Sequence, residues 1–228
     1  QVDGLSQRQV SALSTTQVGI LSRTQLASFT ATQFSSLPYT AMQALSTTQT
    51  AALPATLMGG MTSLQLRALS PEQIASLSAT QIAAIPCTAL KGMTATQCAV
   101  LTATQLAAFS TSQVPYLSVE ATAALDESQL ATLSTTQFAS FSTAQIKSLQ
   151  PAQLASLPQT LITALTSGQC AALNTSQICQ LTPTQIGQMT FTQLSGLTST
   201  LVSAMTETQF AALTETQINL LTANQLTG

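Results

Sequence analysis

The chain has 228 residues, of which 45% are hydrophobic, so it can build a buried core. Only 5% of its residues are charged and its net charge is −2, which argues against nucleic acid or an anionic membrane surface as a partner, because both need clustered Lys and Arg. The chain has no His, no CxxC pair and no apolar run near the ~18 residues of a membrane span, which argues against a zinc or haem site, a His-based triad and a membrane span.

From the first residue onward, Gln recurs every eight residues without a change of phase. It occupies 23 of 29 such positions, which we name a, with b to h for the residues that follow. Position e is Leu, Ile, Met or Phe in all 28 octads, and position b is Val, Ile, Leu, Phe or Met in 25 of 29. Two apolar positions repeating every eight residues would drift around a continuous α-helix of about 3.6 residues per turn. We therefore expect the helix to be interrupted once in every octad.

The first octads show how this interruption is encoded. Ser14 at f and Gln17 at a have the spacing of a capping box, in which each side chain bonds the backbone amide of the other residue. Leu13 at e and Val18 at b have the spacing of a hydrophobic staple. Ser, Thr, Asp or Asn occupies f in 23 of 28 octads. The sequence predicts one capped helix of about seven residues per octad, too short to be stable unless it is stacked on others.

Proline and charge support this register along the whole chain. Pro71, Pro151 and Pro183 lie at g, the first helical position, where a missing amide is tolerated. Six of the seven acidic residues lie at f, g or h, which places them near the positive end of the helix dipole. Three basic residues lie at c, near the other end, whereas Arg8 and Arg23 do not follow the pattern. The acidic residues in register are Glu72, Glu120, Asp126, Glu127, Glu207 and Glu215, and the basic ones are Arg67, Lys91 and Lys147.

Six octads depart from the consensus. Four of them have Pro in place of the capping residue at f and have also lost the Gln, so both partners of the box disappear together. Two more, at Ala121 and Leu201, have lost the Gln alone. The Pro and a-position pairs are Pro38 with Ala41, Pro54 with Leu57, Pro86 with Ala89, and Pro158 with Leu161. The six a positions are 16, 32, 32, 40 and 40 residues apart, and we interpret this coarser period of four or five octads as a sign of the superhelical turn.

Other chemistry-bearing residues have simpler interpretations within the repeat. Cys98 and Cys170 stand at b, where we expect small buried hydrophobic side chains, with a disulfide among the four cysteines as the alternative. Asp126 and Glu127 suit a helix cap and first turn better than a catalytic pair. Asn174 opens an N-glycosylation motif but lies at a cap position, which we favour as its role.

These features predict an all-α solenoid, a superhelix of very short capped helices with one helix per eight-residue repeat, as a single continuous array over residues 1–228. Positions b and e form its core, and g and h face solvent. The chain begins with Gln rather than Met, and neither end has the atypical repeat that normally covers the last apolar face. We therefore expect a segment of a longer repeat protein, or segments that join head to tail into a fibre.

The consensus is clear in segments such as Leu133-Ser134-Thr135-Thr136-Gln137-Phe138. The whole chain resembles the octapeptide arrays of the form Leu-Ser/Thr-x-Thr-Gln-Ile-Ala-Ala in very large predicted secreted bacterial proteins, often labelled adhesin-like or haem-utilisation proteins. The resemblance implies an extracellular or cell-surface location and a role as a stalk or fibre. It implies no catalytic residues.

We expect a non-enzymatic structural protein with no catalytic, cofactor-binding or metal-binding residues and no cofactor. The expected partners are other copies of the chain, head to tail, and glycans. Two alternatives remain open at this stage. One is a solenoid module that binds a peptide or glycan, which would need exposed aromatic residues, and only Tyr39, Tyr116 and Phe191 stand outside the apolar positions. The other is an ice-binding surface of Thr ladders, since Thr or Ser fills h in 20 of 28 octads.

Overall fold

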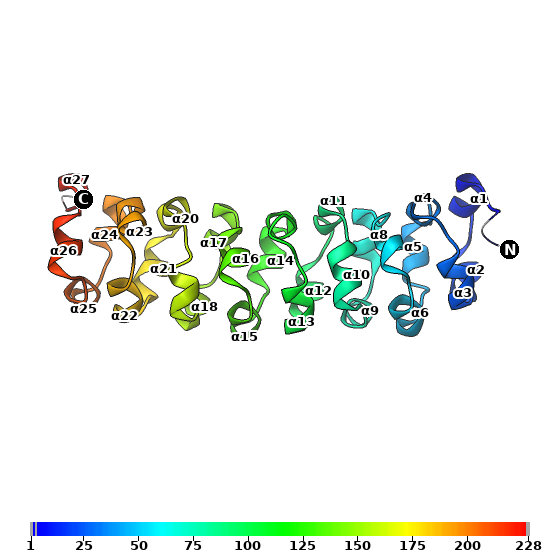
Figure 1. The fold of residues 1–228 in the computed structure, drawn as a ribbon, viewed down its shortest axis with the longest axis horizontal. Coiled ribbons are helices and arrows are strands. Elements are labelled where there is room, and N and C mark those ends of the chain that lie inside the picture. Colours follow the sequence, from blue (N-terminus) through cyan, green and yellow to red (C-terminus); the bar gives the residue numbers. More distant parts are fainter. Residues whose placement is uncertain (1, 3, 227–228) are drawn as a thin grey trace. The chain divides into compact units, whose positions relative to one another are not determined.

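The structure, a computed structural model, describes residues 2 and 4–226. Gln1, the first a position of the repeat, lies outside this part. All regular secondary structure in the described residues is helical, and no strand occurs among them, which confirms the predicted all-α class. Two compact units are present, Gln1–Leu125 and Asp126–Gly228, and each is built from the same octads. Figure 1 labels the helices along the chain. The prediction of one array over residues 1–228 stays a prediction.

The helices of the first unit are α1 (Gln7–Ser11), α2 (Thr15–Gly19), α3 (Arg23–Ala27), α4 (Ala31–Ser35), α5 (Tyr39–Met42), α6 (Thr47–Ala51), α7 (Ala55–Met58), α8 (Ser63–Ala68), α9 (Pro71–Ala75), α10 (Ala79–Ala84), α11 (Cys87–Leu90), α12 (Ala95–Ala99), α13 (Ala103–Ala107), the 3-10 helix η1 (Val114–Tyr116) and α14 (Val119–Ala123).

The helices of the second unit are α15 (Glu127–Ala131), α16 (Thr135–Ala139), α17 (Thr143–Ser148), α18 (Pro151–Ser156), α19 (Gln159–Ile162), α20 (Ser167–Ala172), α21 (Thr175–Gln180), α22 (Pro183–Gly187), α23 (Phe191–Gly196), α24 (Ser199–Ser203), α25 (Glu207–Ala211), α26 (Glu215–Asn219) and α27 (Ala223–Leu226).

Each α-helix begins at g and ends close to the following c or d, as the capping analysis predicts. Their length is four to six residues rather than the expected seven, because the backbone is already leaving the helix at d or e. Capping boxes are present at both ends of the described chain, for example Ser14 with Gln17 and Thr214 with Gln217. None of the helices in the described part has the length and apolar character needed to cross a membrane.

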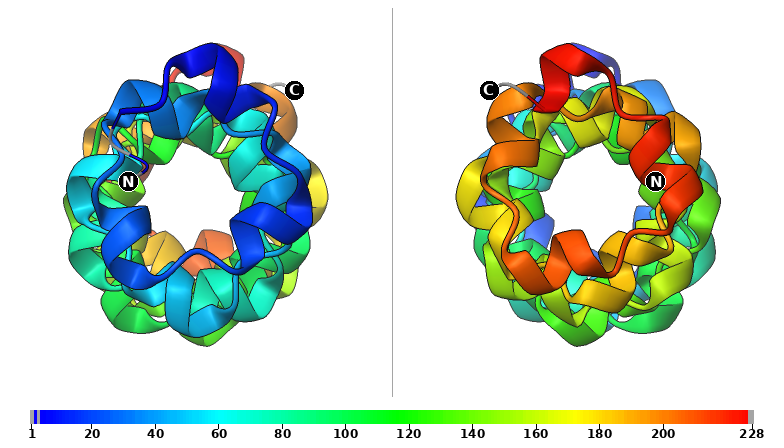
Figure 2. Two further views of the ribbon diagram at one scale, coloured as in Figure 1. Left: turned by 90° about the vertical axis from the view of Figure 1, so that its right-hand side faces the viewer. Right: turned by 90° about the vertical axis from the view of Figure 1, so that its left-hand side faces the viewer.

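In each unit, successive helices follow one another around a ring and climb along its axis. Figure 2 shows this for the blue to green helices of the first unit and for the orange and red helices of the second. A helix packs on the third helix before it and the third after it, as α8 does with α5 and α11, and α20 with α17 and α23. The Gln side chains bond to carbonyls 28 residues earlier, so one turn takes about three and a half octads. The expected turn of four or five octads, taken from the spacing of the Gln-less octads, is wrong.

The core has the composition that the repeat predicts. Side chains at b are fully buried in the inner turns, as with Phe34 and Phe138, and those at e are nearly so, as with Leu37. Thr50 and Thr122 replace an aliphatic residue at b, and each hydroxyl donates to the carbonyl of its helix four residues earlier, at 3.0 Å. A buried hydroxyl is tolerated there because its hydrogen bond is made within the helix.

The octads with proline at f or c deviate from the common helix in two ways. At Pro38, Pro54, Pro86 and Pro158 no side chain caps the helix, and the helices that follow are only four residues long. The octad that contains Pro115 forms a turn and η1 instead of the expected α-helix. Pro115 stands at c, where a missing amide removes a bond that the α-helix requires.

Candidate functional site

The repeating feature of this protein is the hydrogen-bonding environment of the Gln at a, and Gln65 illustrates it. Its side-chain oxygen Oε1 accepts a hydrogen bond of 2.9 Å from the backbone amide of Thr62. Its own backbone amide donates to Thr62 Oγ1 at 3.2 Å. These two bonds are the predicted capping box, and they satisfy amides at the start of α8 that have no partner within the helix.

The other end of the same side chain reaches the preceding turn of the solenoid. Gln65 Nε2 donates to the main-chain oxygens of Phe34 at 2.8 Å and Leu37 at 2.9 Å, which lie at the carboxyl end of α4. Carbonyls at a helix end lack partners within the helix, and in a helix of five residues nearly every polar group lies at an end. One Gln therefore completes the amino end of its own helix and the carboxyl end of a helix one turn earlier.

The same arrangement recurs in both units, and we call it the glutamine ladder. In each case Nε2 donates to the carbonyl at e 28 residues earlier, and usually also to the carbonyl at b 31 residues earlier. The Gln177 side chain is fully buried and bonds Leu149 O at 2.7 Å and Ile146 O at 3.0 Å. Members with both bonds include Gln65, Gln73, Gln81, Gln97, Gln105 and Gln113 in the first unit and Gln177, Gln185, Gln193, Gln209 and Gln225 in the second.

The ladder gives each turn two different faces, and the outermost turns show them. In the first turn of the first unit, Leu13 at e is half-buried while Val18 at b is fully buried. The Gln17 side-chain amide there donates to no carbonyl in the described residues. In the last turn of the second unit, Leu221 at e is buried whereas Ile218 at b is half-buried. Side chains at e and the Gln amides therefore contact the preceding turn, and side chains at b contact the following one.

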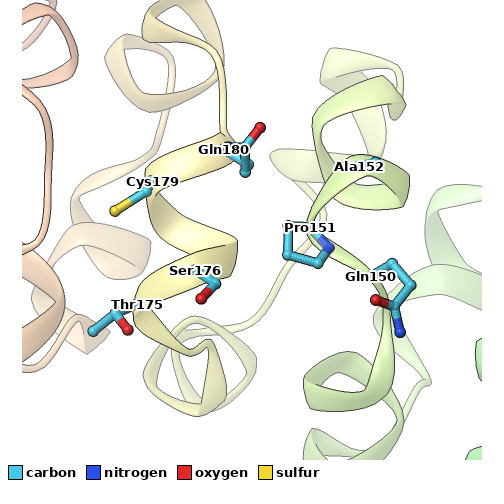
Figure 3. Close-up of a pocket in the computed structure, with 7 residues that line it drawn as sticks. All are labelled: Gln150, Pro151, Ala152, Thr175, Ser176, Cys179 and Gln180. Atoms are coloured by element: carbon cyan, nitrogen blue, oxygen red, sulfur yellow. The ribbon is translucent and has the colours of Figure 1, made fainter.

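The surface of the second unit has an open hollow between α18 and α21, with a volume of about 590 Å³ (Figure 3). Its lining contains neither a carboxylate nor a cation: Gln150, Pro151, Ala152, Thr175, Ser176, Cys179 and Gln180. Figure 3 shows Ser176 and Gln180 on the side of α21 toward Pro151, whereas the Cys179 sulfur points away. Cys179 Sγ instead donates to Ala204 O at 2.9 Å. The lining offers hydroxyls and amides for hydrogen bonding.

The acidic and cap residues lie where the register predicts. Asp126 caps α15, and its Oδ1 accepts from Ser128 Oγ at 2.6 Å and from the Gln129 amide at 2.7 Å. These hydrogen bonds, chiefly that from Ser128, lower the pKa of the Asp126 carboxyl. Asn174 caps α21 and accepts from the Gln177 amide at 2.9 Å. Among the described residues, no group of three or more His, Cys, Asp or Glu side chains is placed to hold a metal ion.

All four cysteines are free thiols, so the alternative of a disulfide is wrong. Cys98 and Cys170 are fully buried at b, as predicted, and burial raises the pKa of each thiol to about 12. Cys87 and Cys179 are only half-buried. The two pairs therefore differ in their access to solvent.

Comparison with known proteins agrees with this repeat. Residues 122–158 match the ALTTAQ repeat family. No curated protein matches the chain. The chain is therefore a tandem-repeat protein. The family comparison shows this for residues 122–158, and the structure shows it in both units.

Of the two roles of the Gln side chain, the capping box was predictable from the sequence, whereas the hydrogen bonds that join the turns were not recognised there. A capping box accepts Glu as readily as Gln, because only an oxygen acceptor is needed. Yet the six a positions that lack Gln are occupied by Ala or Leu and never by Glu. The absence of Glu was the available signal, since only an amide side chain can accept at one end and donate at the other.

Proposed function

We propose that this chain is a non-enzymatic structural protein, an extracellular fibre or stalk or a segment of a cell-surface filament, whose turns assemble head to tail. The observation that carries the proposal is the difference between the two faces of a turn. One face presents Gln amides and half-buried e side chains, and the other presents free carbonyls and half-buried b side chains. The surface that fits either face is another turn of the same repeat.

The outermost turns of the two units support the proposal of head-to-tail assembly. Gln9 and Gln17 have amide groups without a carbonyl acceptor in the described residues, and both side chains are exposed. In the last turn, the carbonyl of Leu213 accepts no hydrogen bond within the described residues, although its equivalent Leu37 accepts one from a Gln. Leu226 at b is 50% exposed. Burial of apolar surface contributes roughly 25 cal/mol per Å², so the two faces prefer each other to water.

The next turn comes either from continuation of the same chain or from a second copy. For the 228-residue chain we propose a second copy. Such a contact joins two different surfaces, and contacts of this kind propagate into an open filament unless the rotation closes a ring. The cell-surface location rests on the resemblance to secreted repeat arrays, and immunolabelling of intact cells of the source organism tests it separately.

Light scattering as a function of protein concentration tests assembly, with electron microscopy of the scattering species. We expect filaments whose length increases with concentration. Leu13→Gln and Ile218→Gln, one on each face, should suppress growth, because each places an amide where an apolar contact is needed. Thr135→Gln, at an exposed g position, is the matched control and should assemble like the parent chain. Circular dichroism establishes that each variant keeps its helices. A chain that stays monomeric at all concentrations, or growth unchanged in both face variants, would overturn the proposal.

A further inference from the structure

Residues at g lie next to residues at h in the following turn, 25 positions later in the chain. Cys87 at g donates from Sγ to the main-chain oxygen of Ser112 at h, at 3.4 Å. Figure 3 shows the same relationship between Pro151 and Ser176, which line one hollow from its two sides. Four further pairs at this spacing each line a hollow together: Tyr39 with Leu64, Thr47 with Glu72, Ala95 with Glu120, and Glu127 with Ala152. An h residue therefore neighbours the preceding turn, and a g residue neighbours the following one.

The outermost turns leave some of these positions uncovered, and the uncovered positions carry opposite charges. Arg8 stands at h in the first turn of the first unit, with no g residue 25 positions before it in this chain. Glu207 and Glu215 stand at g in the last turn of the second unit, with no h residue 25 positions after them. All three side chains are exposed, and none makes a hydrogen bond or ion pair with another residue of the described part of the chain.

The position of Arg8 is unfavourable within its own helix. Arg8 is the second residue of α1, where a cation opposes the helix dipole. The repeat therefore gives no local reason for a basic residue there. Residues 1–28 contain Arg8 and Arg23 against one acidic residue, Asp3, which lies outside the described residues, whereas residues 199–226 contain two Glu and no Lys or Arg. An acidic partner on a neighbouring copy would compensate the local cost of Arg8.

We propose that Arg8 of one copy pairs with Glu215 of the preceding copy, the copy whose last turn meets its first turn. This inference rests on the head-to-tail assembly proposed above and names a specific contact within it. A guanidinium can bond a carboxylate through two parallel hydrogen bonds, which fixes the geometry of the pair. An exposed pair adds little affinity, so its main effects are on the rate of encounter and on the choice of register between the copies.

The glutamine ladder specifies the register of this contact. Within the chain, a Gln amide bonds the carbonyl at e 28 residues earlier. Gln9 has an exposed amide without such an acceptor, and the Leu213 carbonyl is without such a donor. When Gln9 of one copy bonds Leu213 of the preceding copy, the g and h spacing of 25 residues brings Arg8 next to Glu215.

The register one octad earlier is excluded by overlap. It would bring Arg8 next to Glu207, which is also acidic. It would also place Val2 of one copy in the position that Leu226 of the other copy already occupies, because both would stand at the same place in the continued array. Glu215 is therefore the partner that two copies of the 228-residue chain can offer.

Light scattering at low ionic strength tests the pair through the protein concentration at which assembly begins. Arg8→Glu should raise this concentration roughly three- to tenfold, because an attraction becomes a repulsion. The variant should stay folded, since an acidic residue suits the first turn of α1. At about 1 M NaCl the difference from the parent should disappear, because charges are then screened over about 3 Å. The double variant Arg8→Glu/Glu215→Arg should regain the assembly of the parent chain.

Two matched controls separate the pair from a general effect of charge. Arg23→Glu makes the same change of charge at another exposed position of the first turn, but its neighbour 25 positions later is Thr48 of its own chain. It should assemble like the parent. Arg8→Glu/Glu207→Arg has the charges of the rescued double variant with the cation one octad away, and it should remain impaired.

The outcomes separate this inference from the assembly on which it rests. A parent chain that does not assemble overturns both. Assembly of the parent with no effect of Arg8→Glu overturns the pair alone, as does an equal loss in Arg23→Glu. Rescue by Glu207→Arg as complete as that by Glu215→Arg overturns the proposed register and leaves head-to-tail assembly standing.

Discussion

Gln73 Nε2 lies 2.6 Å from the main-chain oxygen of Leu45, a residue 28 positions earlier in the chain and one turn below in the solenoid. Its Oε1 lies 2.6 Å from the backbone nitrogen of Ser70, at the start of its own helix. The side chain is only 3% exposed. A single buried amide therefore holds two turns in register, and replacing its NH₂ group by an oxygen removes the donor that joins the turns while the capping acceptor remains.

Gln73→Glu should therefore destabilise the chain strongly, although Glu is an ideal capping-box residue. The carboxylate would be buried beside the carbonyls of Met42 and Leu45, which now receive hydrogen bonds from Gln73. A buried charge without a partner costs about 3–5 kcal/mol, and urea unfolding at pH 7 measures the loss. Burial raises the pKa of the introduced carboxyl, so the variant should recover stability as the pH falls and the group is protonated.

Gln17→Glu is the control for this substitution. Gln17 makes the same box with Ser14, at 2.8 Å and 3.2 Å, but its side chain is exposed in the first turn. We expect a change within about 0.5 kcal/mol. Similar losses at the two positions would mean that the ladder bonds contribute nothing beyond capping.

Two glycines of the second unit should respond in opposite ways to a methyl group. A Cβ on Gly196 would lie 2.4 Å from the main-chain oxygen of Ser167 in the preceding turn, so Gly196→Ala should destabilise by about 1–3 kcal/mol. A Cβ on Gly168 would have no atom within 4 Å, so Gly168→Ala should stabilise α20 by roughly 0.5–1 kcal/mol. Thermal unfolding followed by circular dichroism measures both, and shifts of the same sign would contradict the close approach of the turns at Gly196.

The four thiols should separate into two classes toward a water-soluble thiol reagent at pH 8. Cys87 and Cys179 should react in the folded chain, because they are half-buried. Cys98 and Cys170 should react only after unfolding, because they are buried and their pKa is raised to about 12. Mass spectrometry of the labelled chain, with and without denaturant, identifies the modified residues. Labelling of Cys98 at the rate of Cys87 in the folded chain would show that b positions are open to solvent.

Asp126 should give α15 a stability that depends on pH. Its pKa is lowered in the folded chain, so its contribution is present above the unfolded pKa and is lost as the pH falls through the folded pKa. Ser128→Ala should raise the Asp126 pKa toward its ordinary value, which NMR titration of the carboxyl measures. Asp126→Asn should keep the cap and remove this part of the pH dependence. An Asp126 pKa unchanged in Ser128→Ala would mean that the Ser128 hydroxyl does not bond the carboxylate in solution.

Much of the fold was predictable because its signals are local. Ser14, Gln17 and Val18 lie within five consecutive residues, and the interactions that they predict form between residues three or four positions apart. The same holds for the caps at Asp126 and Asn174. The expected helix length of seven residues was wrong because the backbone leaves the helix at d or e. The expected α-helix at Pro115 was wrong because a proline at c removes an amide that the helix requires.

The octad, the capped helix and the division into core and surface positions follow from the sequence alone, since each depends on backbone and side-chain groups that are neighbours in the chain. The turn of 28 residues and the contact between Gln73 and Leu45 follow only from the tertiary structure. Both depend on the angle between successive helices. That angle is set by small backbone rotations at the e positions, and these add up along the chain. No single octad encodes that sum, and it becomes defined only when the turns pack on one another.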